Sequence, residues 1–102
     1  MSASLRQQKS RPQGKGKRIV LSAAKYRKLC EYVYERDEYC VFCGRTDSAT
    51  PAHIINRSHG GDDSPNNVVR ACQDCHSKFD AYQIALPEAV SAMLKNEPVS
   101  LF

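Results

Sequence analysis

The sequence predicts a small α+β domain that is stabilised by a structural zinc ion. Three observations support this prediction. The chain has 102 residues, which is enough for one domain, but a core of that size is marginal without a staple. Two Cys-x-x-Cys pairs can supply the staple. A helical apolar stripe then precedes two short runs rich in β-branched residues, so we expect helices together with a small sheet.

The first 18 residues form a basic arm. They carry six of the 15 Lys and Arg residues and no acidic residue, whereas the remaining 84 residues carry a net charge of −2. Because almost no side chain in the arm is apolar, we expect it to be disordered when free. We expect it to grip phosphates through basic residues that include Arg11, Lys15, Lys17 and Arg18. The alternatives are a solubilising tail or residues left from cloning.

The folded domain, residues 19–102, begins with an amphipathic helix. Ser22 is a favourable N-cap, and residues 23–36 carry apolar side chains at the spacing i, i+3, i+4, i+7 and i+8. Cys30 lies on that apolar stripe. We therefore expect Cys30 to be a buried core residue; a ligand or a reactive thiol is the alternative.

The other four cysteines form two knuckles, Cys40/Cys43 and Cys72/Cys75, with 28 residues between them. Two residues between ligands let a turn aim both thiolates at one ion, and two such turns complete a tetrahedral site. The alternatives are two disulfides, which the absence of a secretion signal disfavours, and a redox pair, which needs only one knuckle. The spacing predicts structural Zn²⁺.

Between and after the knuckles the pattern alternates between strands, loops and helices. Residues 52–55 and 67–71 predict two antiparallel strands, and the turn-forming residues 56–66 predict the loop between them. The second knuckle leads into a helix over residues 74–84. Pro87 fits the first turn of a last helix over residues 87–95.

Histidines accompany this zinc framework. His53 falls on the first predicted strand, and His76 falls on the helix after the second knuckle. Asp80 follows His76 by four residues, so the two side chains share one helix face. An imidazole and a carboxylate on one face suit a second divalent cation, distinct from the zinc, although a purely structural histidine is the alternative.

The order of these motifs resembles the HNH nuclease family. Between residues 39 and 82 the chain reads Cys-x-x-Cys, Ala-His-Ile-Ile, Gly-Gly, Asn and Cys-x-x-Cys-His. The helix that ends in Tyr-Glu-Arg-Asp-Glu-Tyr-Cys also resembles the lead-in common in that family. The resemblance implies a ββα-metal fold with motif core 39–82, flanked by an N-terminal helix and a short C-terminal helix.

The resemblance also implies metal-dependent endonuclease activity on DNA phosphodiester bonds, by nicking or by double-strand cleavage. His53 would be the general base, Asn67 would tie the loop to the His53 strand, and His76 would bind the catalytic cation. Asp80 is the expected second ligand and His59 a further one. The cation would be Mg²⁺, Mn²⁺, Ni²⁺ or Zn²⁺, while the cysteine-bound zinc would carry no chemistry.

One departure from the family pattern keeps a second hypothesis open. The position before the general base, which often supplies a metal ligand in the family, is Ala52 here. The alternative is therefore a zinc-stabilised nucleic-acid-binding module that has the HNH fold and little or no activity. The presence of His53, Asn67, His76 and Asp80 argues for the enzyme.

Basic residues near the site complete the sequence prediction. Arg45, Arg57, Arg70 and Lys78 are candidate phosphate contacts, with solvated surface charge as the alternative, and we expect backbone recognition of DNA. No apolar run approaches the about 20 residues of a membrane helix, and no apolar segment as long as that of a signal peptide follows the basic start. We thus expect no membrane partner. The resemblance to the HNH family, together with the lack of a targeting signal, implies a cytoplasmic location in a bacterial or phage-infected cell. The oligomeric state stays open.

Overall fold

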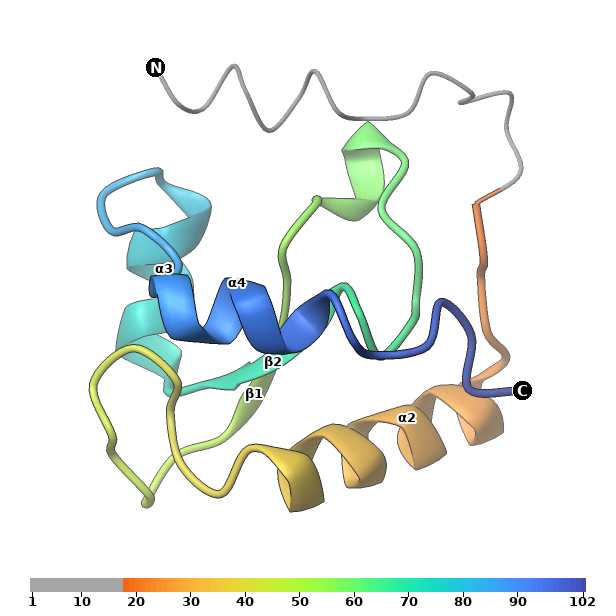
Figure 1. Ribbon diagram of the computed structural model, residues 1–102, viewed down its shortest axis with the longest axis horizontal. Coiled ribbons are helices and arrows are strands. Elements are labelled where there is room, and N and C mark those ends of the chain that lie inside the picture. Colours follow the sequence, from red (N-terminus) through yellow and green to blue (C-terminus); the bar gives the residue numbers. More distant parts are fainter. Residues whose placement is uncertain (1–17) are drawn as a thin grey trace.

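The computed structural model describes residues 18–102, so the predicted basic arm, apart from Arg18, lies outside the described residues. The described elements are helix α2 (Ala23–Arg36), strand β1 (Thr50–His53), the 3-10 turn η1 (Arg57–His59), strand β2 (Val68–Ala71), helix α3 (Gln73–Asp80) and helix α4 (Glu88–Leu94). In Figure 1, α2 crosses the lower part of the view, α3 and α4 lie above it, and both strands run between them. The predicted α+β class is confirmed.

Helix α2 has the bounds that the sequence predicts. The Ser22 hydroxyl accepts a hydrogen bond from the Lys25 backbone N–H at 3.3 Å, which satisfies a donor that the first turn leaves free. Leu29 and Val33, four residues apart, are fully buried and pack with Val68 of β2. Cys30 is only half-buried, so its predicted core position is wrong, because this narrow face buries only the Leu29–Val33 row.

The two strands pair antiparallel, with Ala52 opposite Val69 and His53 opposite Val68. β1 runs over residues 50–53 instead of the predicted 52–55, because the chain leaves the ladder after His53. Pro51 can take part because both strands of a two-stranded sheet are edges, where a missing N–H is tolerated. β2 begins one residue later than predicted.

Helix α3 ends at Asp80, four residues before the predicted end. Tyr82 adopts a left-handed conformation with φ 61°, and the N–H groups of Tyr82 and Gln83 donate to the carbonyls of Phe79 and Lys78. This is the hydrogen-bond pattern that closes many helices at a glycine, but no glycine marks it here. The last helix, α4, agrees with the prediction to within one residue at each end, and Pro87 is its N-cap.

The core has two parts, one on each side of the sheet. One contains Leu29, Val33 and Val68 beneath α2. The other combines three of the four knuckle cysteines with residues of both strands and of α4: Cys40, Ala52, Val69, Ala71, Cys72, Cys75 and Leu94. Within residues 18–102, no helix has the length and apolar character that crossing a membrane would require.

The two glycines of the Gly60-Gly61 pair are needed for different reasons: Gly61 for a close approach to backbone and Gly60 for its positive φ. Substitution of each by alanine separates the two effects. A Cβ on Gly61 would lie 1.7 Å from the Ile55 carbonyl oxygen, whereas a Cβ on Gly60 would meet nothing within 4 Å. We expect Gly61→Ala to cost about 3 kcal/mol or more of unfolding free energy, because backbone must move. Gly60→Ala should lower the unfolding free energy by only about 1–2 kcal/mol, because alanine is strained at the left-handed φ of 86° but has room for its Cβ. Urea unfolding of both variants measures this, and equal costs would contradict the close approach.

Candidate functional site

The four knuckle cysteines converge on one point. Their sulfur atoms all lie within 4.8 Å of one another, and the sulfurs of Cys43 and Cys72 are 3.8 Å apart. A tetrahedral site with metal–sulfur bonds of about 2.3 Å requires sulfur–sulfur distances of about 3.8 Å. The cluster therefore has the donor set and the spacing to hold a metal ion.

Backbone N–H groups of the knuckles donate hydrogen bonds to two of these sulfurs, those of Cys40 and Cys72. The N–H groups of Phe42 and Cys43 donate to the Cys40 sulfur at 3.4 and 3.5 Å, and the Cys75 N–H donates to the Cys72 sulfur at 3.4 Å. Burial raises the pKa of Cys40, but the backbone hydrogen bonds outweigh it and lower the pKa to about 6. The Cys40 thiolate, which is the form that binds metal, is thus favoured at neutral pH, whereas burial and hydrogen bonds with the neighbouring sulfurs raise the pKa of Cys75.

A separate open pocket of about 190 Å³ lies between β1, η1 and α3. Its lining comprises Tyr26, Pro51, His53, Asn56, Arg57, His76 and Asp80. The structure thus brings the predicted catalytic and metal-binding residues His53, His76 and Asp80 around one cavity, together with the predicted phosphate contact Arg57. His59, exposed on η1, is not part of the lining, and Ala52 is fully buried in the core.

His76 and Asp80 line this pocket from helix α3. His76 Nε2 lies 3.3 Å from Asp80 Oδ2, and its Nδ1 lies 2.9 Å from the Thr50 hydroxyl. That hydroxyl has a single proton, which it donates to the Ala71 carbonyl at 2.9 Å, so it accepts from a protonated Nδ1. Nε2 faces the Asp80 carboxylate, and an imidazole nitrogen beside a carboxylate oxygen is a donor pair that suits a divalent cation.

His53 lies on the other side of the pocket, at the end of β1. Its side chain is 11% exposed, and its ring stacks on Tyr26 with centroids 6.3 Å apart and planes 9° from parallel. Burial lowers the pKa of His53 below its ordinary value, and the nearby charge of Arg57 adds to this, while the hydrogen bond to Asp63 opposes it. The ring is therefore neutral at neutral pH, the form that a general base needs.

Asn67 holds the loop against the end of β1. Its side-chain oxygen accepts from the Ile55 N–H at 2.8 Å, and its amide N–H groups donate to the carbonyls of Ile55 and Asp62 at 3.1 and 2.9 Å. The Asn67 carbonyl also accepts from the Ile54 N–H at 2.8 Å. Asn67 does not line the pocket, so it acts on the site through the backbone beside His53.

Of the predicted phosphate contacts within residues 18–102, only Arg57 lines the pocket. Its Nε donates to Asp63 at 3.2 Å, its guanidinium lies 4.9 Å from the centre of the Tyr26 ring, and its side chain is 48% exposed. Arg18 is close by, since its Nη1 donates to the Gly61 carbonyl at 2.8 Å. Arg11, Lys15 and Lys17 lie outside the described residues.

The remaining basic candidates have other partners. Arg70 donates to the carbonyls of Glu38 and Thr46 at 3.1 Å each, so it ties β2 to the first knuckle. Lys78 pairs with Asp74 at 3.3 Å, and Arg45 pairs with Asp47 at 3.2 Å. These three side chains are not part of the pocket lining, and their contact with phosphates stays a prediction.

Sequence reasoning missed three residues of the site, Tyr26, Thr50 and Asp63. Tyr26 was expected to be a core or rim position of the helix, and Thr50 lies before the predicted strand. Asp63 lies in the turn-forming segment 56–66, which predicts only a loop. The Asp62-Asp63 doublet, ten residues after His53, was the one available signal, but a carboxylate in a polar loop is normally solvated.

Comparison with known proteins agrees with this arrangement. Residues 40–86 match the family model described as HNH endonuclease. The matched segment contains both knuckles, His53, His76 and Asp80, and it leaves out α2 and the segment before it. Neither the curated proteins nor the solved structures contain a match to the chain. The family match indicates a nuclease or another nucleic-acid-related function.

Proposed function

Because residues 40–86 match the family model of HNH endonucleases, we propose that this chain is a metal-dependent endonuclease that hydrolyses phosphodiester bonds in DNA. The observation that carries the proposal is the single pocket in which a neutral imidazole, His53, lies across from a ligand pair, His76 and Asp80. A base on one side and a cation on the other is the arrangement that metal-assisted hydrolysis requires.

His53 supplies the base in this proposal. The neutral ring accepts a proton from the attacking water, and its low pKa keeps the base free at neutral pH. Stacking on Tyr26 and the hydrogen bond with Asp63 restrict the ring to one orientation. A restricted ring does not have to be ordered at the moment of reaction.

His76 Nε2 and Asp80 Oδ2 would hold the catalytic cation, which is Mg²⁺, Mn²⁺, Ni²⁺ or Zn²⁺. When bound, such an ion stabilises the charge that develops on the scissile phosphate and on the leaving 3′ oxygen. Arg57 is positioned at the pocket to pair with a phosphate. Arg18, followed outward by the other basic residues of the arm, would extend this grip along the DNA backbone.

The cysteine cluster has a structural role in the proposal. Four thiolates in tetrahedral spacing favour Zn²⁺, and such a closed site has no open position for substrate. Its contribution is to position the sheet and α3, because the second knuckle forms the first turn of the helix that carries His76.

The second candidate function is a nucleic-acid-binding module with the same fold and little or no turnover. The observation that favours it is the buried Ala52, which leaves two protein ligands at the pocket in place of three. The two candidates differ in whether DNA is cut, because both would bind it.

Cleavage of supercoiled plasmid and single-stranded DNA, with each of the four cations in turn, tests the proposal. We expect the wild-type protein to cut, and Asp80→Asn to lose about 10-fold to 100-fold of the rate, because a ligand for the cation is weakened. The matched control is Asp74→Asn on the same helix, since Asp74 pairs with Lys78 away from the pocket, and its rate should be unchanged. If the wild-type protein shifts DNA in a gel but never cuts it, the binding module is the correct function.

A further inference from the structure

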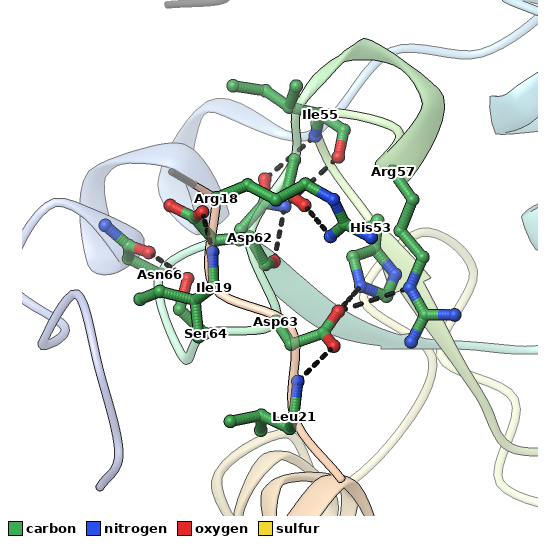
Figure 2. A network of polar contacts seen from close by, with 12 residues as sticks. Arg18, Ile19, Leu21, His53, Ile55, Arg57, Asp62, Asp63, Ser64 and Asn66 are labelled. Atoms are coloured by element: carbon green, nitrogen blue, oxygen red, sulfur yellow. Dashed lines mark hydrogen bonds and ion pairs between the residues drawn. The ribbon is translucent and has the colours of Figure 1, made fainter. Parts of the chain in front are cut away.

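Asp63 is a buried carboxylate at the centre of the polar network beside the pocket (Figure 2). Its side chain is 1% exposed. Oδ1 lies 2.9 Å from His53 Nε2 and 3.2 Å from Arg57 Nε, and Oδ2 accepts from the Leu21 N–H at 3.1 Å. A buried carboxylate is tolerated only with such partners, and these three come from β1, η1 and the segment before α2.

The partners keep this carboxylate ionised. Burial by itself raises the pKa of Asp63, but the hydrogen bonds from His53 and Leu21 and the charge of Arg57 outweigh it, so the pKa lies below its ordinary value. An ionised carboxylate has no proton to give and can only accept hydrogen bonds. The proton in the contact between Asp63 and His53 therefore belongs to His53 Nε2.

A neutral imidazole carries one proton on its two nitrogens, so a proton on Nε2 leaves a lone pair on Nδ1. Within residues 18–102, Nδ1 of His53 has no hydrogen-bond partner. We propose that Asp63 is a positioning residue that holds His53 in the Nε2–H tautomer and so presents Nδ1 as the proton acceptor. The catalytic consequence rests on the proposed function of His53 as general base.

The position of Asp63 depends in turn on the segment Arg18–Leu21, which runs alongside the loop in Figure 2. The Ile19 N–H donates to Asp62 Oδ1 at 2.8 Å, and the Asp63 N–H donates to the Ile19 carbonyl at 3.0 Å. This segment lies 42–43 residues from the loop and outside the stretch that matches the family. The tautomer of His53 is thus secured in part by residues that the family match does not include.

Two-bond ¹H–¹⁵N correlation spectra of the full-length, zinc-loaded protein test the proposal, because they tell a protonated ring nitrogen from an unprotonated one. We expect the wild-type His53 to be protonated on Nε2 at neutral pH. Asp63→Asn removes the obligate acceptor and should populate the Nδ1–H form. Asp74→Asn is the control: this exposed carboxylate pairs with Lys78 on α3 and has no contact with His53 or with the loop, so the tautomer should persist.

Cleavage kinetics supply the second readout. Asp63→Asn should lower kcat by about 100-fold or more with little change in KM, because the base is in the wrong tautomer. Asp74→Asn should leave kcat near the wild-type value. A merely structural role for Asp63 would lower the folded fraction without changing the tautomer of the molecules that remain folded.

Two results would overturn the proposal: a wild-type His53 protonated on Nδ1, or a folded Asp63→Asn protein with the wild-type tautomer. The first needs no variant, so the proposal remains testable even if Asp63→Asn does not fold. Failure of the proposed function is distinct, because it would appear as absence of wild-type cleavage while the spectra still report which ring nitrogen carries the proton.

Discussion

Replacement of His53 by alanine is expected to lower DNA cleavage by about 100-fold or more while zinc content and DNA binding stay unchanged. The imidazole is the neutral base candidate of the pocket, which it lines together with the proposed cation ligands His76 and Asp80. Without it, water must lose its proton to solvent. Time courses of plasmid cleavage under saturating cation measure the effect, and gel shifts measure binding.

The His53 experiment needs two further variants. His53→Ala leaves Asp63 buried without one of its donors, which can cost about 1–3 kcal/mol of stability. His53→Gln can still donate to Asp63 from its side-chain amide but is no base, so it should be folded and equally inactive. His59→Ala, at an exposed position outside the pocket, should cut like wild type. Wild-type cleavage by His53→Gln would refute the assignment of the base.

Removal of the metal from the four-cysteine cluster is expected to unfold the whole domain. Cys40, Cys72 and Cys75 are themselves core residues, packed with both strands and with Leu94 of α4. Structural zinc binding contributes about 10–16 kcal/mol, whereas small domains are stable by about 5–15 kcal/mol in total. Loss of the ion would also leave buried sulfurs that repel one another when ionised, so no comparable fold should survive.

Circular dichroism during titration with a strong chelator measures the loss of structure, and metal analysis follows the zinc. Cys72→Ser should lose both zinc and helix content. Cys30→Ser is the matched control, because Cys30 is the one cysteine outside the cluster, and it should retain one zinc per chain and a cooperative melt. A wild-type melt that strong chelator leaves unchanged would contradict the structural role of the cluster.

The parts that the sequence predicted well depend on spacing within a short stretch. The two knuckles follow from Cys-x-x-Cys alone, since two intervening residues fix the geometry of each turn. Helix α2 follows from its N-cap, Ser22, and its apolar stripe. His76 and Asp80 share a face because four residues are about one helical turn. In each case the residues that decide the structure are neighbours in the chain.

The parts that were wrong depend on partners that local patterns do not contain. The β-branched residues of segment 52–55 predict a strand that continues to Ile55. In the structure, the backbone N–H and carbonyl of Ile55 bond to the side chain of Asn67, twelve residues away, so they do not pair with the other strand. The helix α3 stops where Tyr82 adopts a conformation usually left to glycine. Both outcomes are set by hydrogen bonds that form only once distant segments meet.

Local sequence patterns are enough to predict the four-cysteine cluster, the first helix and the helix face that carries His76. The burial of Asp63 against His53 and the contact of Thr50 with His76 follow only from the folded arrangement. The physical reason is that a carboxylate in a polar loop is normally solvated, and it is stable in the interior only when donors arrive together. Those donors come from Leu21, His53 and Arg57, and no stretch of sequence shows that they converge.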